Sequence, residues 1–407
     1  MNGARILFLS YDGLSDPLGQ SQVLPYLERL AGRGHQMVVV SCEKPESLKE
    51  RRLAVGATCN QAGIEWHPLM YHKKPAIVST LADLAAMRRT AARLHRENRF
   101  DIVHCRSYLT ALIGRSMQRR TGVKFLFDMR GFWIDERFER GIWDARNPVY
   151  KWIAEWFRRR EYEFLQHADV VVSLTVAARD ELQSRRGMNL AKKTIIIPCC
   201  VDLAHFDPKD GRARADGRAL LGINDDVPLL LFLGSLGGAY PLEPVRQFFE
   251  EWSAGESNAR LLFVTRHSRA ELLADPGMTD LASRVIVCAA ERNDVPKLIA
   301  AADVAVSFIL PSFSAIASSP TKVGEILAMG VPIVANANVG DMAVVLDNSR
   351  AGILLGDLSH PSVQRAAKLL RSVRPDPNAA RATADRWYSL EQGVQRYDQI
   401  YRTLSRD

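Results

Sequence analysis

The chain has 407 residues, of which 47% are hydrophobic, and 54 basic against 46 acidic side chains give it a formal net charge of +8. Its length suffices for two domains of about 200 residues each, and its hydrophobic content is ordinary for a globular protein. It contains no run of about 18 apolar residues, which excludes a membrane-spanning helix. The six cysteines form no C-x-x-C pair, which argues against zinc and redox motifs and favours reduced thiols in a cytoplasmic protein.

The excess of basic side chains indicates anionic partners, such as nucleotide phosphates, anionic lipid or nucleic acid. A nucleic-acid-binding surface requires a stripe of positive charge interleaved with aromatic side chains. The basic residues are instead spread along the chain among nearly as many acidic ones, so nucleic acid is not expected as a partner.

The first half of the chain alternates short apolar runs with segments of helical periodicity. The apolar runs predict strands at residues 5–10, 36–41, 64–69, 101–105, 124–129, 168–174 and 193–198. The helical periodicity is clearest at residues 22–31, 77–98 and 147–166. This alternation predicts a parallel sheet with helices on both faces, in which ligands bind at the carboxyl ends of the strands.

A second alternating series predicts a second domain of the same α/β class. Its strands are expected at residues 228–234, 260–265, 284–288, 303–309 and 331–335. The stretch between the two series, Asp202–Val227, is rich in Asp, Arg and Gly and has little periodicity, so we interpret it as an interdomain linker. A final helix is expected at residues 387–402.

The loop after the first strand, Asp12–Gln22, is the first candidate for substrate contact. Gly19 would let the backbone approach a ligand closely, and the helix that follows would offer its N-terminus to a phosphate or to an acceptor hydroxyl. Asp12 and Gln20 are its candidate acceptor-side residues. On spacing alone, an ordinary strand-to-helix turn explains the loop equally well.

Polar and aromatic residues also gather after the fourth and fifth strands. The stretch Phe127–Arg137 contains Asp128, Arg130, Trp133 and Asp135, which suit sugar recognition because Trp offers an apolar face and carboxylates accept hydroxyls. A solvated loop is the alternative. The end of the fourth strand adds two candidates for substrate contact, His104 and Arg106, although a lone histidine is more often structural.

The helix predicted at residues 147–166 has an apolar row ahead of a basic cluster. The row consists of Val149, Trp152, Ile153 and Trp156, and the cluster ends in Arg158, Arg159 and Arg160. One interpretation is an interfacial helix that meets anionic lipid. The other, which we favour, is a helix whose apolar row faces the core and whose basic side is solvated.

A glycine-rich loop follows the first strand of the second series. Gly234, Ser235, Gly237 and Gly238 lie in it, and such a loop lets backbone N–H groups face a phosphate. It lacks the G-K-[ST] of a Walker loop, which disfavours P-loop chemistry. A plain glycine turn is the alternative.

The stretch Ser318–Asn336 predicts a loop, a helix closed by Gly330, and a buried strand. The residues that open it are Ser319, Pro320 and Thr321. Free N–H groups at the helix start attract anions, Lys322 adds a positive charge, and Glu325 could accept both hydroxyls of a ribose. The spacing indicates a nucleotide diphosphate site, the alternative being a surface helix in which Lys322 and Glu325 pair at i, i+3.

Four stretches of the chain resemble motifs of family-4 glycosyltransferases with the GT-B fold. P-T-K-V-G-E at 320–325, followed by I-L-A-M-G-V-P-I-V-A, resembles the family signature P-x-K-x-x-E…A-x-G-x-P-V-V. The stretch 127–137 resembles E-V-R-D-L-W-P-E of the bacterial cell-surface members, 199–208 resembles the linker N-G-V-D-x-x-x-F-x-P, and 234–238 resembles the loop that opens the donor domain. The departures from these patterns are Ala317 for a sugar-side Glu, Gly131 for Asp, and Cys199 and Cys200 for Asn and Gly.

The resemblance implies a GT-B enzyme with two Rossmann-like domains. Residues 1–200 would bind the acceptor, a growing surface glycan or its lipid carrier, and residues 201–386 would bind a nucleotide-diphosphate sugar, with UDP expected and GDP the alternative. The tail 387–407 would pack back on the first domain. The protein would be cytoplasmic, and peripheral association with the membrane stays open.

The resemblance also implies roles for single residues in a retaining, metal-independent transfer that needs no cofactor. The candidate catalytic residues are Lys322, Arg266, Asp128 and Arg130. Val295 would lie near the pocket for the base. Two rival functions remain, a GT-B nucleotide-sugar 2-epimerase or hydrolase and, more remotely, a basic nucleic-acid-binding protein.

Overall fold

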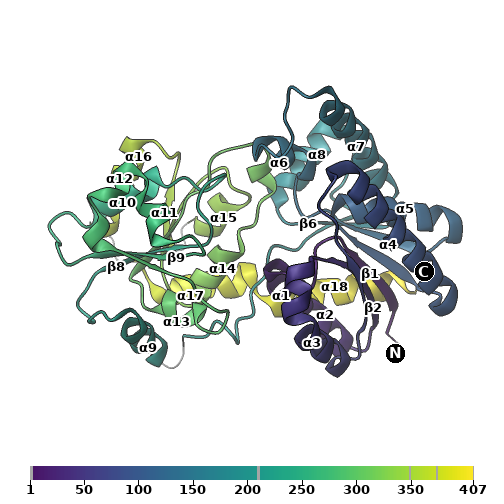
Figure 1. Ribbon diagram of the computed structural model, residues 1–407, viewed down its shortest axis with the longest axis horizontal. Coiled ribbons are helices and arrows are strands. Elements are labelled where there is room, and N and C mark those ends of the chain that lie inside the picture. Colours follow the sequence, from purple (N-terminus) through teal and green to yellow (C-terminus); the bar gives the residue numbers. More distant parts are fainter. Residues whose placement is uncertain (1–2, 209–210, 348–349, 373–374, 407) are drawn as a thin grey trace. The chain divides into compact units, whose positions relative to one another are not determined.

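The computed structural model describes residues 3–208, 211–347, 350–372 and 375–406. The chain divides into two compact units, one formed by Met1–Pro198 with Leu390–Asp407 and the other by Cys199–Ser389. Each unit contains a parallel sheet with helices packed around it (Figure 1). The two doubly wound α/β domains expected from the sequence are therefore confirmed.

The sheet of unit 1 has the strand order β3-β2-β1-β4-β5-β6-β7, and each neighbouring pair is parallel. Its strands are β1 Arg5–Ser10, β2 Gln36–Glu43, β3 Glu65–Met70, β4 Ile102–Arg106, β5 Lys124–Asp128, β6 Val170–Ser173 and β7 Thr194–Ile196. The order reverses between β1 and β4. In such sheets the loops that leave the carboxyl ends of the two strands at the reversal form the ligand crevice.

The helices of unit 1 follow the strands in the expected alternation. They are α1 Pro17–Gln22, α2 Leu24–Gly32, α3 Pro45–Gln61, α4 Ala76–Asn98, α5 Ser107–Thr121, α6 Trp133–Glu139, α7 Pro148–His167, α8 Val176–Arg186 and α18 Leu390–Leu404. The helix predicted at 22–31 is broken at Val23, which has non-helical backbone angles and separates α1 from α2.

The sheet of unit 2 has the strand order β10-β9-β8-β11-β12-β13, again parallel throughout. Its strands are β8 Leu229–Leu233, β9 Arg260–Val264, β10 Val285–Cys288, β11 Val304–Ser307, β12 Ile333–Asn336 and β13 Gly352–Leu355. Its helices are α9 Arg212–Leu221, α10 Glu243–Trp252, α11 Arg269–Leu273, α12 Pro276–Thr279, α13 Val295–Ala300, α14 Thr321–Ala328, α15 Met342–Leu346, α16 His360–Ser372 and α17 Pro377–Tyr388, with 3-10 turns at Ala282–Arg284 and Ser314–Ala317.

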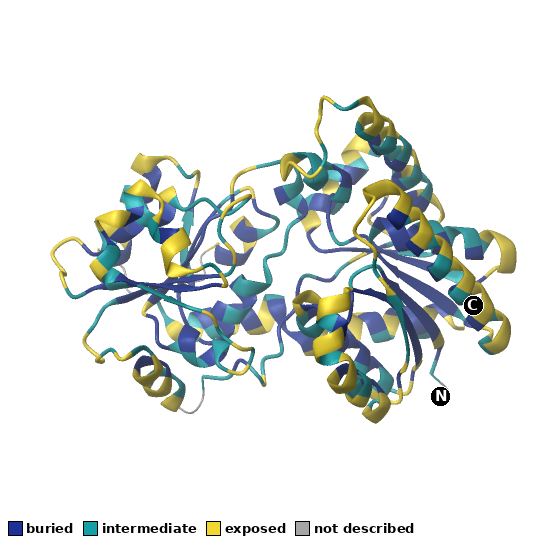
Figure 2. Ribbon diagram, viewed as in Figure 1, coloured by how far each residue is buried: buried dark blue, intermediate teal, exposed yellow. Residues whose placement is uncertain are grey.

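Successive residues of β8 point to opposite faces of the sheet and divide the core of unit 2 into two layers. Leu229 and Leu231 belong to the layer that includes α14 and α17, whereas Leu230 and Phe232 belong to the layer that includes α10 and α16. Figure 2 shows the central strands of both sheets as buried and the outward sides of the helices as exposed. The continuous apolar runs in the sequence are therefore explained by strands covered on both faces.

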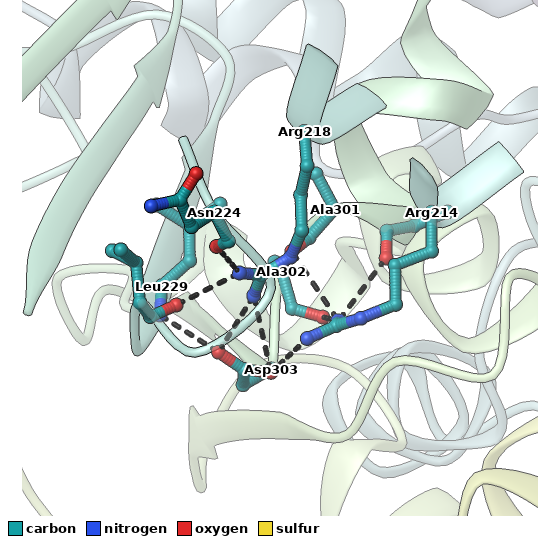
Figure 3. Close-up of polar contacts among 9 residues, drawn as sticks. Arg214, Arg218, Asn224, Leu229, Ala301, Ala302 and Asp303 are labelled. Carbon is teal, nitrogen blue, oxygen red and sulfur yellow. Dashed lines mark hydrogen bonds and ion pairs between the residues drawn. The ribbon is translucent and has the colours of Figure 1, made fainter. Parts of the chain in front are cut away.

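The predicted linker Asp202–Val227 is wrong in one respect, because it contains the helix α9. A buried arginine fixes this helix to the start of β11 (Figure 3). Arg218 is 1% exposed and donates to the carboxylate of Asp303 at 3.2 Å and to the carbonyl oxygen of Ala301 at 3.1 Å. Charged residues and an interior glycine gave this segment no apolar periodicity, so the pattern could not reveal it.

The tail is helical as expected, but its boundary lies elsewhere. Trp387 belongs to the last turn of α17 in unit 2, which ends at Tyr388, and α18 begins at Leu390 in unit 1 after an interruption of the helix at Ser389. At the break, the N–H of Val201 donates to the carbonyl oxygen of Tyr388 at 2.7 Å, so the two ends of unit 2 lie side by side. The expected tail also included residue 407, which lies outside the described residues.

We expected the apolar row of the helix at 147–166 to face the core, and this prediction is wrong. Val149 is 50% and Trp152 is 69% exposed in α7. The residues that α7 buries are Ala154, Phe157, Glu161, Phe164 and Leu165. This buried stripe continues into the second half of the helix, whereas the row chosen from the sequence stops at Trp156 and lies beside it.

Candidate functional site

The start of α14 carries the strongest candidate residues in unit 2. Pro320 caps the helix with extended backbone angles, and Gly330 ends it with a φ of 72°. Val323, Ile326 and Leu327 are fully buried against the sheet, which leaves Lys322 and Glu325 on the half-buried side. The predicted loop, helix and glycine stop are confirmed, and the helix is fixed by its apolar face.

Lys322 extends over two aromatic rings next to the glycine-rich loop. Its Nζ lies 4.0 Å from the ring centroid of Tyr240 and 4.9 Å from that of Phe232. A Cβ placed on Gly234 would lie 3.8 Å from the same Nζ, so the lysine and the loop are neighbours. Ring faces attract a cation but do not neutralise it.

Burial lowers the pKa of Lys322 to about 7. Within the described residues no carboxylate pairs with its ammonium group, and the i, i+3 pair with Glu325 that the sequence left open is not formed. A nearby anion would raise this pKa again and stabilise the charged form. The geometry therefore provides a partly desolvated cation that is suited to an anionic ligand.

Burial likewise raises the pKa of Glu325 to about 7, and the positive charge of Arg292 opposes this shift. In the described part of the chain no group donates a hydrogen bond to the Glu325 carboxylate. Two free carboxylate oxygens can accept two hydroxyl groups of one ligand. The contact of Glu325 with a ribose diol stays a prediction.

The glycine-rich loop differs from the expectation in its hydrogen bonds. Gly234, Gly237 and Gly238 all have positive φ, at 115°, 83° and 59°, which explains the need for glycine. However, the N–H of Gly234 donates to Val264 at 2.9 Å, and that of Gly237 donates to Tyr240 at 3.1 Å. These two donors are therefore engaged, and the loop positions Tyr240 under Lys322 instead of offering both groups to a phosphate.

The remaining candidates of unit 2 lie on segments near the carboxyl ends of its strands. Arg266 follows β9 and is exposed, Ser235 follows β8 and is exposed, and Val295 begins α13. The hydroxyl of Ser319 accepts the N–H of Cys199 at 3.1 Å, so it holds the loop before α14, and Thr321 is the first residue of that helix. The structure brings Lys322 next to Tyr240 and Gly234.

In unit 1 the residues predicted at the ends of β4 and β5 form a buried cluster with α18. Nδ1 of His104 lies 2.6 Å from the hydroxyl of Tyr401, and the hydroxyl of Tyr397 donates to Asp128 at 3.1 Å. His104 and Asp128 are each 2% exposed. These side chains hold the C-terminal helix on the sheet, and their position supports a structural role.

Charges inside this cluster shift its titration. Burial would raise the pKa of Asp128, but Arg130, His104 and Arg106 lower it below its ordinary value. Burial lowers the pKa of His104 despite the neighbouring Asp128. Arg106 extends the cluster outwards, since its Nε lies 3.5 Å from the carboxylate of Asp12, whose side chain is 47% exposed. Asp12 is thus the accessible end of the group.

The loop after β1 is organised by a residue that the sequence gave no reason to select. Glu43 is fully buried at the end of β2 and accepts the N–H groups of Leu14 at 2.8 Å and Ser15 at 3.0 Å. A Cβ on Gly19 would lie 2.0 Å from the carbonyl oxygen of Gly13. Gly19 is therefore required by close packing of the chain on itself, and the expected approach to a ligand is not what fixes it.

The other predicted acceptor-side residues already have partners within unit 1. Gln20 donates to the carbonyl oxygen of Leu14 at 2.7 Å, and Asp135 pairs with Arg158 at 3.1 Å. Trp133 packs in an aromatic cluster, and the guanidinium of Arg137 lies 4.8 Å above its ring. A free aromatic platform for a sugar is therefore not formed by Trp133.

No group of three or more His, Cys, Asp or Glu side chains among the described residues is arranged to hold a metal ion. Over the same part of the chain, none of the helices has the length and apolar character needed to cross a bilayer.

The comparisons with known proteins agree with this architecture. Residues 19–200 match the glycosyl transferase 4-like domain, and residues 227–372 match glycosyl transferases group 1. A D-inositol 3-phosphate glycosyltransferase of Kineococcus radiotolerans is 28% identical over 321 residues, which cover 74% of this chain and 68% of that protein.

Two solved structures show the same fold at low sequence identity. Sucrose-phosphate synthase from Thermosynechococcus elongatus has a TM-score of 0.71 with 17% identity and covers 98% of this chain and 99% of its own. Anabaena HepE in complex with UDP-glucose has a TM-score of 0.69 with 14% identity, covering 99% of this chain and 100% of its own. With both domain families matched in order along two Rossmann-like units, the chain belongs to the family-4 glycosyltransferases of the GT-B fold.

Proposed function

We propose that this glycosyltransferase binds a nucleotide-diphosphate sugar on unit 2 and transfers its sugar to a glycan or lipid-linked acceptor with retention of the anomeric configuration. The observation that carries the proposal is the ammonium group of Lys322, which lies over two aromatic rings without a carboxylate partner among the described residues. A diphosphate would supply the missing negative charge. UDP is the proposed nucleotide and GDP the alternative, and a role in surface polysaccharide synthesis in the cytoplasm follows from the motif resemblance.

In the proposed reaction the bond between the anomeric carbon and the phosphate oxygen breaks while the acceptor hydroxyl approaches the same face of the sugar. The hydroxyl proton passes to the departing phosphate oxygen, and a new glycosidic bond forms. Lys322 and Arg266 would stabilise the negative charge that grows on the diphosphate, which is where electrostatic stabilisation lowers the barrier. No metal or cofactor is required by this scheme.

Glu325 would orient the donor through its ribose. The carboxylate has no donor among the described residues, so a ribose diol can occupy both of its oxygens. Thr321, Ser319 and Val295 would border the same nucleotide. The orientation of the sugar relative to the ammonium group then depends on one helix, α14, because Lys322 and Glu325 lie one turn apart on it.

The buried cluster of unit 1 leads us to move two residues out of the reaction. Asp128 and His104 are enclosed with Tyr397 and Tyr401, so we assign them to holding α18 and not to proton transfer. Asp12 is the better candidate for an acceptor contact, because its carboxylate is half exposed and Arg106 fixes it at 3.5 Å.

Product analysis separates transfer from the rival reactions. The protein should be incubated with UDP- and GDP-sugars that stabilise it in a thermal-unfolding screen, first without and then with candidate acceptors. Transfer predicts nucleotide release that depends on an acceptor, with a product of retained anomeric configuration by NMR and an unchanged rate in the presence of a chelator. Epimerised sugar or free sugar formed from the donor alone would instead support a 2-epimerase or a hydrolase.

A further inference from the structure

Unit 1 has an arginine-lined groove that includes Arg160 of the basic cluster on α7. The groove lies between α5 and α7 and encloses a cavity of about 420 Å³. The residues that line it include Arg115, Arg119, Arg120, Trp156, Arg160 and Glu163. A groove with four arginines attracts anions, and guanidinium groups bind phosphate oxygens well.

The positive charge of this groove is only partly neutralised. Arg115 lies 3.2 Å and Arg160 lies 2.5 Å from the carboxylate oxygens of Glu163, so two arginines share one acid. Arg119 and Arg120 are exposed, and neither forms an ion pair with the described residues. The groove therefore has a net positive charge with two guanidinium groups that are accessible from solvent.

An exposed apolar row leads directly into the groove along α7. Val149, Trp152, Trp156 and Arg160 follow one another at spacings of three and four residues, which places them on one face of the helix. Trp152 is 69% exposed, and the guanidinium of Arg160 lies 5.0 Å above the ring of Trp156. Exposed tryptophan beside arginine on one helix face is the composition of a surface that lies in a lipid interface.

We propose that this face, the α5–α7 surface formed by Trp152, Trp156 and the four arginines, binds anionic phospholipid. Phosphate groups of the lipid enter the groove and Trp152 inserts among the headgroups. Charge complementarity selects this partner, because the groove offers cations and the adjoining row is apolar, whereas a nucleic acid would leave the apolar row uncovered. The proposal is independent of the proposed transfer reaction, since lipid binding is measured without donor or acceptor.

Vesicle sedimentation tests the proposal with the full chain. The protein should sediment with vesicles of phosphatidylcholine mixed with phosphatidylglycerol, stay in solution with phosphatidylcholine alone, and be released by high salt. Arg119→Gln with Arg120→Gln should lower the partition coefficient about 30-fold, since each basic residue at the surface contributes about 1 kcal/mol. Trp152→Ser should lower it about tenfold through the loss of apolar burial.

Matched variants elsewhere on unit 1 serve as controls. Arg88→Gln with Arg89→Gln removes the same charge from two exposed neighbours on α4, and Leu53→Ser removes a side chain that is 89% exposed on α3. Both should bind vesicles like the wild type, and all variants should keep its melting temperature. Equal loss in the two arginine pairs, or no selectivity for anionic vesicles in the wild type, would overturn the proposal. Competition by a single-stranded oligonucleotide that depends on Arg119 and Arg120 would also overturn it and assign the groove to nucleic acid.

Discussion

Burying the ammonium group of Lys322 lowers the stability of the folded protein, because burial disfavours the charged form. Its pKa of about 7 lies below the ordinary value of 10.5, so between these values the folded protein binds fewer protons than the unfolded chain. Stability therefore rises with pH across that window, and charging the lysine destabilises the fold most below pH 7. A side chain kept in such a position is a candidate for function.

Lys322→Met should therefore stabilise the free protein and impair its reaction. We expect the melting temperature of the variant to exceed that of the wild type below pH 7, with a gap that narrows as the pH rises towards 10.5. The kcat should fall about 10²- to 10³-fold, as when one oxyanion donor is removed, with a smaller change in donor KM. Lys322→Arg should restore activity only in part. A raised KM with unchanged kcat would show that the lysine binds the donor without assisting the departure of the diphosphate.

The effect of Glu325 on stability has the opposite pH dependence. Its folded pKa of about 7 lies above the ordinary 4.5, so between these values the folded protein binds more protons than the unfolded chain and stability falls as the pH rises. Glu325→Gln should therefore stabilise the free protein above pH 7. It should weaken donor binding about 10- to 150-fold, the equivalent of one charge-assisted hydrogen bond of about 1.5–3 kcal/mol. Unchanged donor affinity in calorimetry would remove the ribose assignment.

Together these two groups predict a change of sign in proton exchange on donor binding. Binding should favour charged Lys322 and charged Glu325, and both have a pKa of about 7 in the free protein. A nucleotide-diphosphate sugar should therefore release a proton below pH 7, from Glu325, and take one up above pH 7, onto Lys322. Calorimetry in buffers of different ionisation enthalpy measures this exchange. Glu325→Gln should abolish the release and Lys322→Met the uptake, and a wild type without the reversal would contradict the pairing.

At the scale of elements, α9 depends on one buried arginine. Arg218 joins the carboxylate of Asp303 to the carbonyl oxygens of Ala301, Asn224 and Val227. Arg218→Ala should lower the free energy of unfolding by about 3 kcal/mol, because one buried acceptor and several partly buried ones lose their donor. Arg214→Ala is the matched control, since Arg214 also contacts Asp303 but is 38% exposed, and its cost should be below about 1 kcal/mol. Similar losses of stability in the two variants would show that burial of the arginine is not decisive.

The elements also show where sequence reasoning succeeds. Apolar runs such as that of β8 predict strands well because burial on both faces leaves little choice of residue type. The loop, helix and glycine stop around Lys322 are predictable for the same reason, but the proximity of Lys322 to the glycine-rich loop, where a Cβ on Gly234 would lie 3.8 Å from its Nζ, comes from the tertiary structure. Hydrogen bonds are less predictable, since the engagement of the Gly237 N–H by Tyr240 depends on a turn that no periodicity encodes.

The features that the sequence analysis did not predict have a common physical cause. Arg218 is buried on α9, and Glu43 is a fully buried carboxylate. A prediction from the hydrophobic pattern assigns charged residues to the surface and therefore overlooks both. Likewise, His104 and Asp128 were expected to contact substrate. Their actual partners lie on α18, more than 250 residues away in the sequence, so the sequence around them does not reveal the contact. Buried polar groups are defined by distant partners, so their role emerges only with the tertiary structure.

At the scale of the whole molecule, unit 1 is completed by the last helix of the chain. Tyr397 and Tyr401 of α18 cover the cluster at the ends of β4 and β5, and Asp398 accepts a hydrogen bond from His35 at 2.7 Å. A fragment of residues 1–198 should therefore show weak protection in hydrogen exchange and a lower melting temperature. Adding a peptide of residues 390–407 should restore both. A fragment that is equally stable without the peptide would show that α18 does not contribute to the stability of unit 1.

The hydrogen bond between Val201 and Tyr388 has a consequence for the engineering of the protein. Because the two ends of unit 2 meet there, the unit is topologically an insertion into unit 1. Its termini could be joined by a short peptide and reopened at an exposed loop, giving a circular permutant. Because its ends are adjacent, unit 2 could also be replaced by another domain whose ends lie close together, with unit 1 joined at residues 198 and 390.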